Sequence, residues 1–425
     1  MINIKDLKKN FDQIRKHILD KDPAFPIDKL WELYNKRNTI LQEISLYNEK
    51  INVLSNNVKI GCNDHHDVQL EVKDIKKKQQ ILQKDFEKIE QEFNLLALSC
   101  PNIIFDDVPL GTKNENFCCR TFSHQPQFSF QPKNHLELLT IYSKDTIAFG
   151  SKISKGGFYA YEDKIAWLIY RLAFICLKYN EKNGFRVLHI PQVANYETIK
   201  NAGNLPRFTD ELFFIANMDL ILIPTAEVVL ASYCQDRIYQ YDQLPVRITS
   251  WTRCYRKEVG GYGANERGLI RIHEFEKIEL FSFTSEDRSQ QEQEYMVKLV
   301  EGLLQLFNIH YKVMLLASQD CSFSSAKTYD IEIWLPGQNQ YKEVSSISNC
   351  TDFQARRSNT KYVKNGKNYL MHTLNGSSLA LPRLMVALIE NWQNKDGIDF
   401  DGLFHLLSEI EQKIETKLHP HNSIK

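Results

Sequence analysis

The chain has 425 residues, of which 43% are hydrophobic, so it is long enough for two or three domains with a sizeable core. Lysine plus arginine equals aspartate plus glutamate at 53 each, so no overall field attracts nucleic acid, and any RNA binding must be local. The nine cysteines include no CxxC pair, which argues for reduced thiols in a cytosol and against a disulfide framework or a structural zinc site.

Targeting and membrane signals are weak. The N-terminal stretch carries Asp6 and Asp12 without an apolar run, so it reads as neither a signal peptide nor a transit peptide. The most apolar window, residues 165–177, is too short to cross a bilayer and contains Arg171. We therefore expect a cytoplasmic protein with no membrane partner.

Two heptad stretches dominate the N-terminal region, after a short helix expected around residues 6–19. Apolar residues recur at steps of three and four, at Leu30, Leu33, Ile40, Ile44, Tyr47, Ile51, Leu54 and Val58, and again at Val68, Val72, Ile75, Leu82, Phe86, Ile89, Phe93 and Leu96. Arg37 and Gln79 fill the places where the pattern breaks, and residues 61–64 have turn chemistry. The pattern predicts an antiparallel coiled-coil hairpin over residues 27–98, about 45 Å long.

The heptads alone leave the use of this arm open. A dimerisation or spacer coiled coil is the commoner use of such a pattern. The lysine cluster at residues 73–78 suits contact with phosphates, and it equally suits a solvated helix face, because acidic residues lie among the lysines.

The middle of the chain begins with a helical pattern over residues 161–179, closed by Gly184. A strand is expected over residues 185–190, ending before Pro191. Further on, Thr225 and Glu227 follow an apolar strand and open a helix-like run. A capping threonine followed by an acid explains them without any ligand, and a hydroxyl beside a carboxylate also suits an ammonium and a hydroxyl.

Residues 251–283 read as a strand, a glycine-rich loop and a second strand. Alternation places Arg256 and Glu258 on one face of the first strand, and Phe275, Lys277 and Glu279 on one face of the second. A solvated amphipathic hairpin is the plain interpretation. The mixture of cations, an aromatic ring and carboxylates also suits a ligand that carries phosphates, a base and an amine.

This hairpin, with RKEVGGYG and then RGLIRIHEFEKIEL, resembles motif 2 of class II aminoacyl-tRNA synthetases, specifically the seryl-tRNA synthetases. The family usually has Asp-Thr where Asn265 and Glu266 stand. The helix, strand and Pro191 resemble motif 1, which implies a homodimer. HTLNGSSLALPRLMVALIENWQ at residues 372–393 resembles motif 3, with an expected turn over residues 375–378 and Pro382 in the first turn of a helix.

The resemblance implies the site residues. The implied ATP-binding residues are Arg256, Lys257, Glu258, Phe275, Glu343, Val344, Ser345, Ser346 and Arg383. The implied serine-binding residues are Thr225, Ala226, Glu227, Glu279 and Ser377. Arg256 and Arg383 are the implied catalytic residues, and Glu343 and Ser346 would hold the Mg²⁺ that accompanies ATP.

Two details of this site depend on local backbone geometry. Strict strand alternation places Glu343 with Ser345, so a bulge or a strand end must re-aim the side chain if Ser346 is the ligand. Ser378, which stands where the family commonly has glycine, would crowd the serine pocket.

The expected fold is therefore α+β, an antiparallel class II sheet flanked by helices, with the helical arm in a tRNA-binding domain at residues 1–104 and the catalytic domain at residues 105–425. The implied activity is ATP-dependent ligation of L-serine to tRNA(Ser) through seryl-adenylate, with the arm holding the tRNA. Two alternatives stay open: a related ligase that loads another carrier, and a catalytically dead coiled-coil protein that binds RNA.

Overall fold

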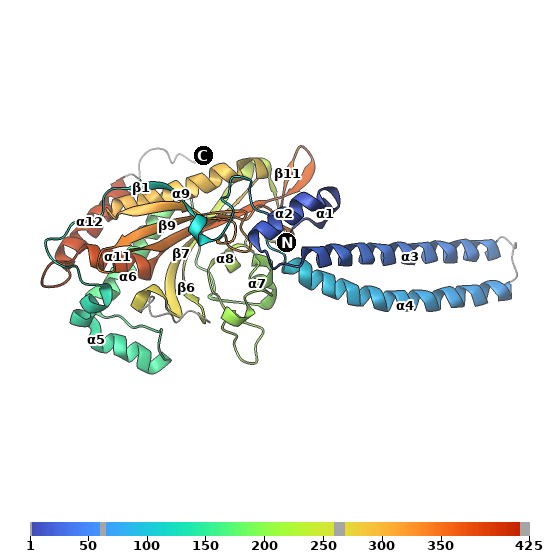
Figure 1. Ribbon diagram of the computed structural model, residues 1–425, viewed down its shortest axis with the longest axis horizontal. Helices are drawn as coiled ribbons and strands as arrows, with labels where there is room; N and C mark the ends of the chain where they lie inside the picture. Colours follow the sequence, from blue (N-terminus) through green and yellow to red (C-terminus); the bar gives the residue numbers. More distant parts are fainter. Residues whose placement is uncertain (1, 60–64, 259–267, 417–425) are drawn as a thin grey trace, which may run out of the picture. The chain divides into compact units, whose positions relative to one another are not determined.

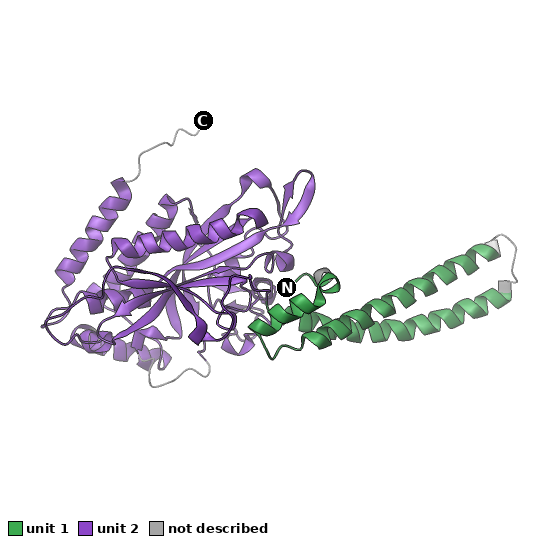
Figure 2. Ribbon diagram, turned by 45° about the horizontal axis from the view of Figure 1, so that its top comes forward, with its two compact units in different colours: residues 1–101 green, residues 102–425 purple. Residues whose placement is uncertain are grey.

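The structure, a computed structural model, describes residues 2–59, 65–258 and 268–416. The chain divides into two compact units, Met1–Pro101 and Asn102–Lys425 (Figure 2). The predicted turn at residues 61–64 and the glycine-rich loop with Asn265 and Glu266 lie outside the described residues. Within the described ranges, no helix is long and apolar enough to cross a membrane.

The first unit is entirely helical in its described part. Its helices are α1 Ile4–Lys9, α2 Phe11–Lys21, α3 Ile27–Lys59 and α4 His65–Leu98. α3 and α4 run side by side as the predicted hairpin (Figure 1). The single helix expected over residues 6–19 is wrong, because the backbone leaves the helical region at Asn10, with φ −142°, and so separates α1 from α2.

Both breaks in the heptad pattern of the arm are filled by partners from the opposite helix. Arg37 of α3 makes an ion pair with Glu90 of α4. Gln79 of α4 donates to Oδ1 of Asn48 at 2.8 Å. These polar pairs cross between the two helices where the apolar pattern is interrupted, and polar positions of this kind favour one register over others.

An eight-stranded sheet organises the second unit, in the order β1-β8-β9-β10-β13-β7-β6-β2. Its strands are β1 Phe117–Phe122, β2 Arg186–Val187, β6 Val246–Tyr255, β7 Glu274–Thr284, β8 Tyr311–Leu315, β9 Lys327–Leu335, β10 Gln340–Asn349 and β13 His372–Ala380. Every neighbouring pair is antiparallel except β2 with β6. The expected α+β fold with an antiparallel sheet is confirmed.

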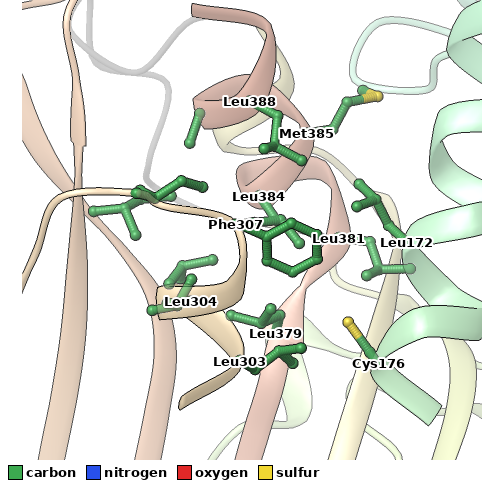
Figure 3. Packing of buried hydrophobic residues seen from close by; sticks show 14 of the residues in the cluster. Leu172, Cys176, Leu303, Leu304, Phe307, Leu379, Leu381, Leu384, Met385 and Leu388 are labelled. Atoms are coloured by element: carbon green, nitrogen blue, oxygen red, sulfur yellow. The ribbon is translucent and has the colours of Figure 1, made fainter. Parts of the chain in front are cut away.

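Three helices cover one face of this sheet and form the main core with it: α6 Asp163–Lys182, α9 Ser289–Leu306 and α11 Leu381–Asn391. Two further helices pack on these, α5 His135–Ser154 against α11 and α12 Phe400–Thr416 against α6. Figure 3 shows leucines of α6, α9 and α11 around Leu379 of β13. Pro382 lies in the first turn of α11, as predicted, where its missing N–H leaves no hydrogen bond unmade.

Smaller elements complete the unit. They are α7 Tyr196–Ala202, α8 Glu227–Leu230, α10 Ala355–Ser358, β3 Val193–Ala194, β4 Ile221–Leu222, β5 Ile238–Gln240, β11 Lys361–Lys364, β12 Lys367–Leu370 and the 3₁₀ turns η1 Lys113–Glu115, η2 Thr209–Glu211, η3 Tyr241–Gln243, η4 Gly268–Ile270 and η5 Glu286–Arg288.

Two local predictions are wrong. The turn expected at residues 375–378 lies inside β13, which hydrogen-bonds to β7 on one side and β10 on the other. Gly376 permits this close approach, since a Cβ there would lie 2.9 Å from Cγ1 of Ile347. The strand expected over residues 185–190 is only the two-residue β2, paired with the edge of β6.

Candidate active site

The alternation of β7 separates the core from a polar face. Ile278 and Leu280 are fully buried in the helix-covered core. Lys277 and Glu279 take the opposite face, as strand geometry requires. Ser377 of β13 pairs directly with Glu279 across the ladder. The sheet therefore brings the motif 2 and motif 3 segments together at one place.

A cavity of about 310 Å³ opens on this polar face. It is lined by Glu211, Arg256, Glu258, Leu269, Ile270, Arg271, Ile272, Phe275, Lys277, Glu343, Ser377, Ala380, Pro382 and Arg383. Six of these are site residues implied by the sequence: Arg256, Glu258, Phe275, Glu343, Ser377 and Arg383. A single cavity thus holds residues from segments that are more than a hundred positions apart in the chain.

A buried polar cluster lies beside Lys277 in the cavity wall. Nζ of Lys277 donates to Oγ1 of Thr225 at 2.8 Å and lies 2.5 Å from Oε2 of Glu279. The Thr225 hydroxyl in turn donates to Glu279 at 2.8 Å. Lys277 is a site residue that the sequence analysis did not assign. Its signal was a lysine sharing a strand face with Phe275 and Glu279.

Glu227 lies in a second buried cluster next to the first. One carboxylate oxygen, Oε1, accepts from Nε2 of Gln354 at 2.7 Å and from Nδ2 of Asn375 at 2.9 Å. Burial, followed by the negative charge of Glu279, raises the pKa of Glu227 to about 7. Gln354 and Asn375 hold this carboxyl in place, and sequence reasoning gave neither of them a role.

Arg256 lies just past the end of β6 and is held from three sides. Its Nε donates to the carbonyl of Pro224 at 3.1 Å, and its backbone N–H donates to the carbonyl of His273 at 2.9 Å. The guanidinium carbon lies 5.2 Å from the centre of the Phe275 ring. Glu258 makes an ion pair with Arg271 at 2.6 Å, and both of these charged side chains line the cavity.

Arg383 occupies the first turn of α11 and reaches across the cavity. Its Nε donates to the carbonyl of Ile270 at 3.2 Å, and its Nη1 donates to the carbonyl of Glu343 at 2.8 Å. The same Nη1 lies 3.4 Å from Oε2 of Glu343. Backbone carbonyls therefore fix the guanidinium at the end of a helix whose N-terminus favours anions.

The bulge expected in β10 is confirmed. The register of β10 with β9 shifts between Glu343 and Ser345, so Glu343 pairs with Glu332 and Ser346 pairs with Asp330. Burial and the charge of Glu343 raise the pKa of Asp330 well above its usual range, against a hydrogen bond from Ser346. Glu343 and Ser346 thus lie next to a further carboxyl that the sequence analysis did not assign.

Eight implied residues are not among those that line the cavity. Thr225, Glu227, Glu279 and Ser346 make the contacts described above, and the other four lie as follows. Ala226 is buried in an apolar cluster, and Val344 is buried in the main core. Ser345 is buried and donates to the carbonyl of Ser377 at 2.5 Å. Lys257 donates through its backbone N–H to Glu211, and its Nζ lies 5.8 Å from the Phe214 ring.

Ser378 does not crowd the cavity, contrary to expectation. Its hydroxyl donates to Oδ1 of Asn180 on α6 at 3.1 Å, within the buried layer between sheet and helix. Ser377 and Ser378 are consecutive strand residues and therefore point to opposite faces of the sheet. The register shift in β13 between Ser377 and Leu379 leaves Ser378 as the extra residue, on the core side next to Leu379. Ser377 lines the cavity, and Ser378 anchors the sheet to α6.

No group of three or more histidine, cysteine, aspartate or glutamate side chains is arranged to hold a metal ion in the parts of the chain that the structure describes. The expectation of no zinc site stays a prediction.

Comparisons with known proteins agree with the geometry. Residues 212–392 match the family model for the tRNA synthetase class II core domain (G, H, P, S and T), and residues 1–104 match the seryl-tRNA synthetase N-terminal domain. A serine–tRNA ligase of Aliarcobacter butzleri (strain RM4018) is 40% identical over 405 residues, which cover 93% of this chain and 97% of that protein. One from Helicobacter pylori (strain ATCC 700392 / 26695) is 36% identical over 403 residues, with the same coverage.

The fold is similar to a solved structure of the same kind. A crystal structure of seryl-tRNA synthetase from Pyrococcus horikoshii complexed with ATP superposes with a TM-score of 0.88 at 27% identity, covering 96% of this chain and 98% of that one. Sequence and fold therefore agree, and the chain belongs to the serine–tRNA ligases, which are class II aminoacyl-tRNA synthetases.

Proposed function

We propose that this enzyme joins L-serine to tRNA(Ser) in two steps in the cavity described above. The serine carboxylate attacks the α-phosphate of ATP, which forms seryl-adenylate and releases pyrophosphate. The terminal ribose hydroxyl of the tRNA then attacks the seryl carbonyl and releases AMP. The observation that carries the proposal is one cavity that combines two fixed guanidiniums with a buried Lys277–Glu279–Thr225 cluster.

ATP would lie along the wall formed by Arg256, Phe275 and Arg383. Arg256 would contact the α-phosphate and the serine carboxylate, since it is held at the cavity by Pro224. Phe275 would stack on the adenine ring and Glu258 would accept from its amino group. Arg383 would hold the γ-phosphate. Because these protein groups are already fixed in place, they would accelerate the reaction by positioning the reactants and by neutralising the negative charge of the phosphates.

Glu343 and Ser346 are the proposed holders of Mg²⁺. Both supply oxygen ligands, which Mg²⁺ prefers, and the bulge in β10 pairs them with Glu332 and Asp330, alternate residues of β9 that share one face of the sheet. When bound with ATP, the ion would reduce the negative charge of the triphosphate. The buried Asp330 fits this assignment, because a carboxyl next to Ser346 would orient its hydroxyl.

Serine would bind over the two buried clusters. Thr225, Glu279 and Ser377 would meet its ammonium and hydroxyl groups, with Glu227 close behind them. The site would reject alanine by about 10⁴-fold or more, because alanine would leave buried polar groups without a partner.

The helical arm is proposed to hold tRNA(Ser), and the enzyme is proposed to be a cytoplasmic homodimer. One face of α6 supports the second proposal, since Trp167 and Phe174 are 65% and 61% exposed there, with Tyr170 between them. Large apolar side chains gathered on one helix face are typical of a protein interface. A second copy of the chain is the proposed occupant.

The test is serine-dependent exchange of pyrophosphate into ATP, run with all twenty amino acids and with a magnesium-free control. We expect exchange with serine alone, lost without Mg²⁺ and in Arg256→Ala. Removal of residues 27–98 should leave this exchange intact and abolish charging of tRNA(Ser). Exchange without charging of tRNA(Ser) by the full chain would favour a ligase for another carrier, and no exchange would favour the RNA-binding alternative.

A further inference from the structure

His135, the first residue of α5, is buried within hydrogen-bonding distance of three separate segments: α11, η4 and the turn between β9 and β10, where Nε2 of Gln338 lies 3.1 Å from its Nδ1. Its side chain is 2% exposed. Nδ1 lies 3.0 Å from Oε1 of Glu390 on α11, and Nε2 lies 3.3 Å from the backbone nitrogen of Leu269. The ring therefore joins the turn η4 to the motif 3 helix.

The partners define the tautomer of this ring. The amide of Leu269 can only donate, so Nε2 must keep its lone pair and the proton must lie on Nδ1, where it is donated to Glu390. Glu390 is fully buried and also accepts from the backbone of His135 and Gly337 and from Nε2 of Gln338, each at 2.9 Å. A carboxylate with so many donors is fixed, and it fixes the imidazole in turn.

The segment that His135 holds is part of the cavity wall. Leu269 and Ile270 of η4 both line the cavity. The carbonyl of Ile270 accepts from Nε of Arg383, which lies near the start of the helix that carries Glu390. The contacts form a closed loop. His135 contacts Glu390 and accepts from the amide of Leu269. The neighbouring carbonyl of Ile270 accepts from Arg383, which lies on the same helix as Glu390.

We propose that His135 is a positioning residue of the ATP site, which holds η4 so that the carbonyl of Ile270 keeps the Arg383 guanidinium in place for the triphosphate. This inference rests on the proposed function. His135 touches no substrate in it. Without the imidazole ring, the Leu269 amide would lose its acceptor, and η4 would lose its link through His135 to Glu390 of α11. If η4 then moved, Arg383 would lose the Ile270 carbonyl, one of its two carbonyl acceptors.

Close packing at Gly268 supports a positional role. Gly268 has φ +76°, and a Cβ there would lie 2.5 Å from Nε2 of His135 and 2.8 Å from Cδ2 of Leu136. There is no room between η4 and the histidine ring. A small displacement of either would therefore pass directly to the other.

The test compares two variants, each of which keeps one of the two hydrogen bonds of the histidine ring. In His135→Asn the amide nitrogen can take the place of Nδ1 and donate to Glu390, but nothing accepts from Leu269. In His135→Gln the longer side chain can bring its amide oxygen to the place of Nε2 and accept from Leu269, but the donor to Glu390 is lost. A pure folding role predicts similar effects of both. A positional role predicts a difference between them.

In serine-dependent pyrophosphate exchange, we expect His135→Asn to raise KM for ATP roughly 10-fold, with KM for serine nearly unchanged, because misplacement of a catalytic group by about 1 Å costs up to 100-fold. His135→Gln should return KM for ATP to near the value of the unmodified enzyme. Equal values of KM for ATP in the two variants, or a change in melting temperature alone, would overturn the inference.

Gly268→Ala tests the same contact from the other side, in case the histidine variants fold poorly. Its matched control is Gly366→Ala, which has a similar φ of +73° with nothing within 4 Å of the added Cβ. We expect only Gly268→Ala to raise KM for ATP, and equal effects would count against the inference. Failure of the unmodified enzyme to exchange would instead count against the proposed function, so the two failures are distinguishable.

Discussion

The Arg383 guanidinium donates to the backbone carbonyl of Glu343 at 2.8 Å, so the motif 3 helix and the bulged strand β10 meet at the cavity through a main-chain acceptor. A backbone acceptor keeps its place whatever the protonation state of nearby side chains. The contact therefore sets the direction of the guanidinium, and the carboxylate of Glu343, 3.4 Å from the same Nη1, adds an ion pair to it.

Replacing Arg383 with lysine should keep the positive charge but lose the fixed orientation that the guanidinium has. An ammonium cannot donate to two carbonyls and a phosphate in one plane, so we expect kcat/KM for ATP to fall by roughly 100-fold in pyrophosphate exchange. Arg120→Lys is the control, because Arg120 makes an ion pair with Glu301 through both its Nε and Nη2 in another part of the sheet. A similar loss in both variants would show that Arg383 has no special place in the reaction.

The stability of the enzyme should depend on pH through Glu227. Its pKa is about 7 in the folded protein and near 4.5 when unfolded, so between these values the folded state binds more protons, and stability falls as pH rises. Glu227→Gln imitates the protonated carboxyl and should remove this loss, which is at most about 3 kcal/mol.

The measurement is the melting temperature at pH 5 and pH 8. The drop between the two should be smaller in Glu227→Gln than in the unmodified enzyme. Glu43→Gln, at an exposed position of α3, should leave the drop as it is. An unchanged drop in the Glu227 variant would mean that this carboxyl stays ionised in the fold.

The exposed face of α6 should be the homodimer interface. Phe174→Asp places a charge among Trp167 and Tyr170, and desolvating an unpaired carboxylate costs several kcal/mol, so we expect a monomer in sedimentation velocity. Leu110→Asp is the control, since Leu110 is similarly exposed outside α6. A Phe174→Asp variant that remains dimeric would place the interface elsewhere.

The hydrogen bond between Gln79 and Asn48 should stabilise the arm only when both partners are present. Gln79→Leu leaves Asn48 without its partner and should destabilise the arm by about 1 kcal/mol, and adding Asn48→Leu should restore stability. Faster hydrogen exchange of α4 amides in the single variant would report this. Gln83→Leu is the control, because the hydrogen bond of Gln83 stays within α4, where it donates to Glu87. Equal exchange in the two single variants would contradict the prediction.

The elements that were predicted from the sequence are those whose signal is local. The arm was predicted because its heptads repeat within each helix, and the start of α11 because Pro382 favours a first turn. The turn expected at residues 375–378 failed because Gly376 was interpreted from its own propensity. Strand pairing on both sides of β13 decides the conformation there.

One physical reason explains why several site residues could not be predicted from the sequence. Lys277, Gln354 and Asn375 belong to separate elements, and only the folded sheet reveals that they meet around Thr225 and Glu227. A lysine in a strand ordinarily indicates a solvated face. The burial of Lys277 depends on Glu279 two residues later and on a threonine about fifty residues earlier, and spacing alone does not predict the second of these.

The two polar pairs of the arm also limit how this protein can evolve. Arg37 with Glu90 and Asn48 with Gln79 fasten the hairpin at two heights. A single inserted residue between the fastened positions would rotate everything beyond it by about 100° and separate one pair. Lineages that lengthen or shorten the arm should therefore do so by whole heptads, added or lost in both helices together, so that gaps in related sequences should occur as matched pairs of seven.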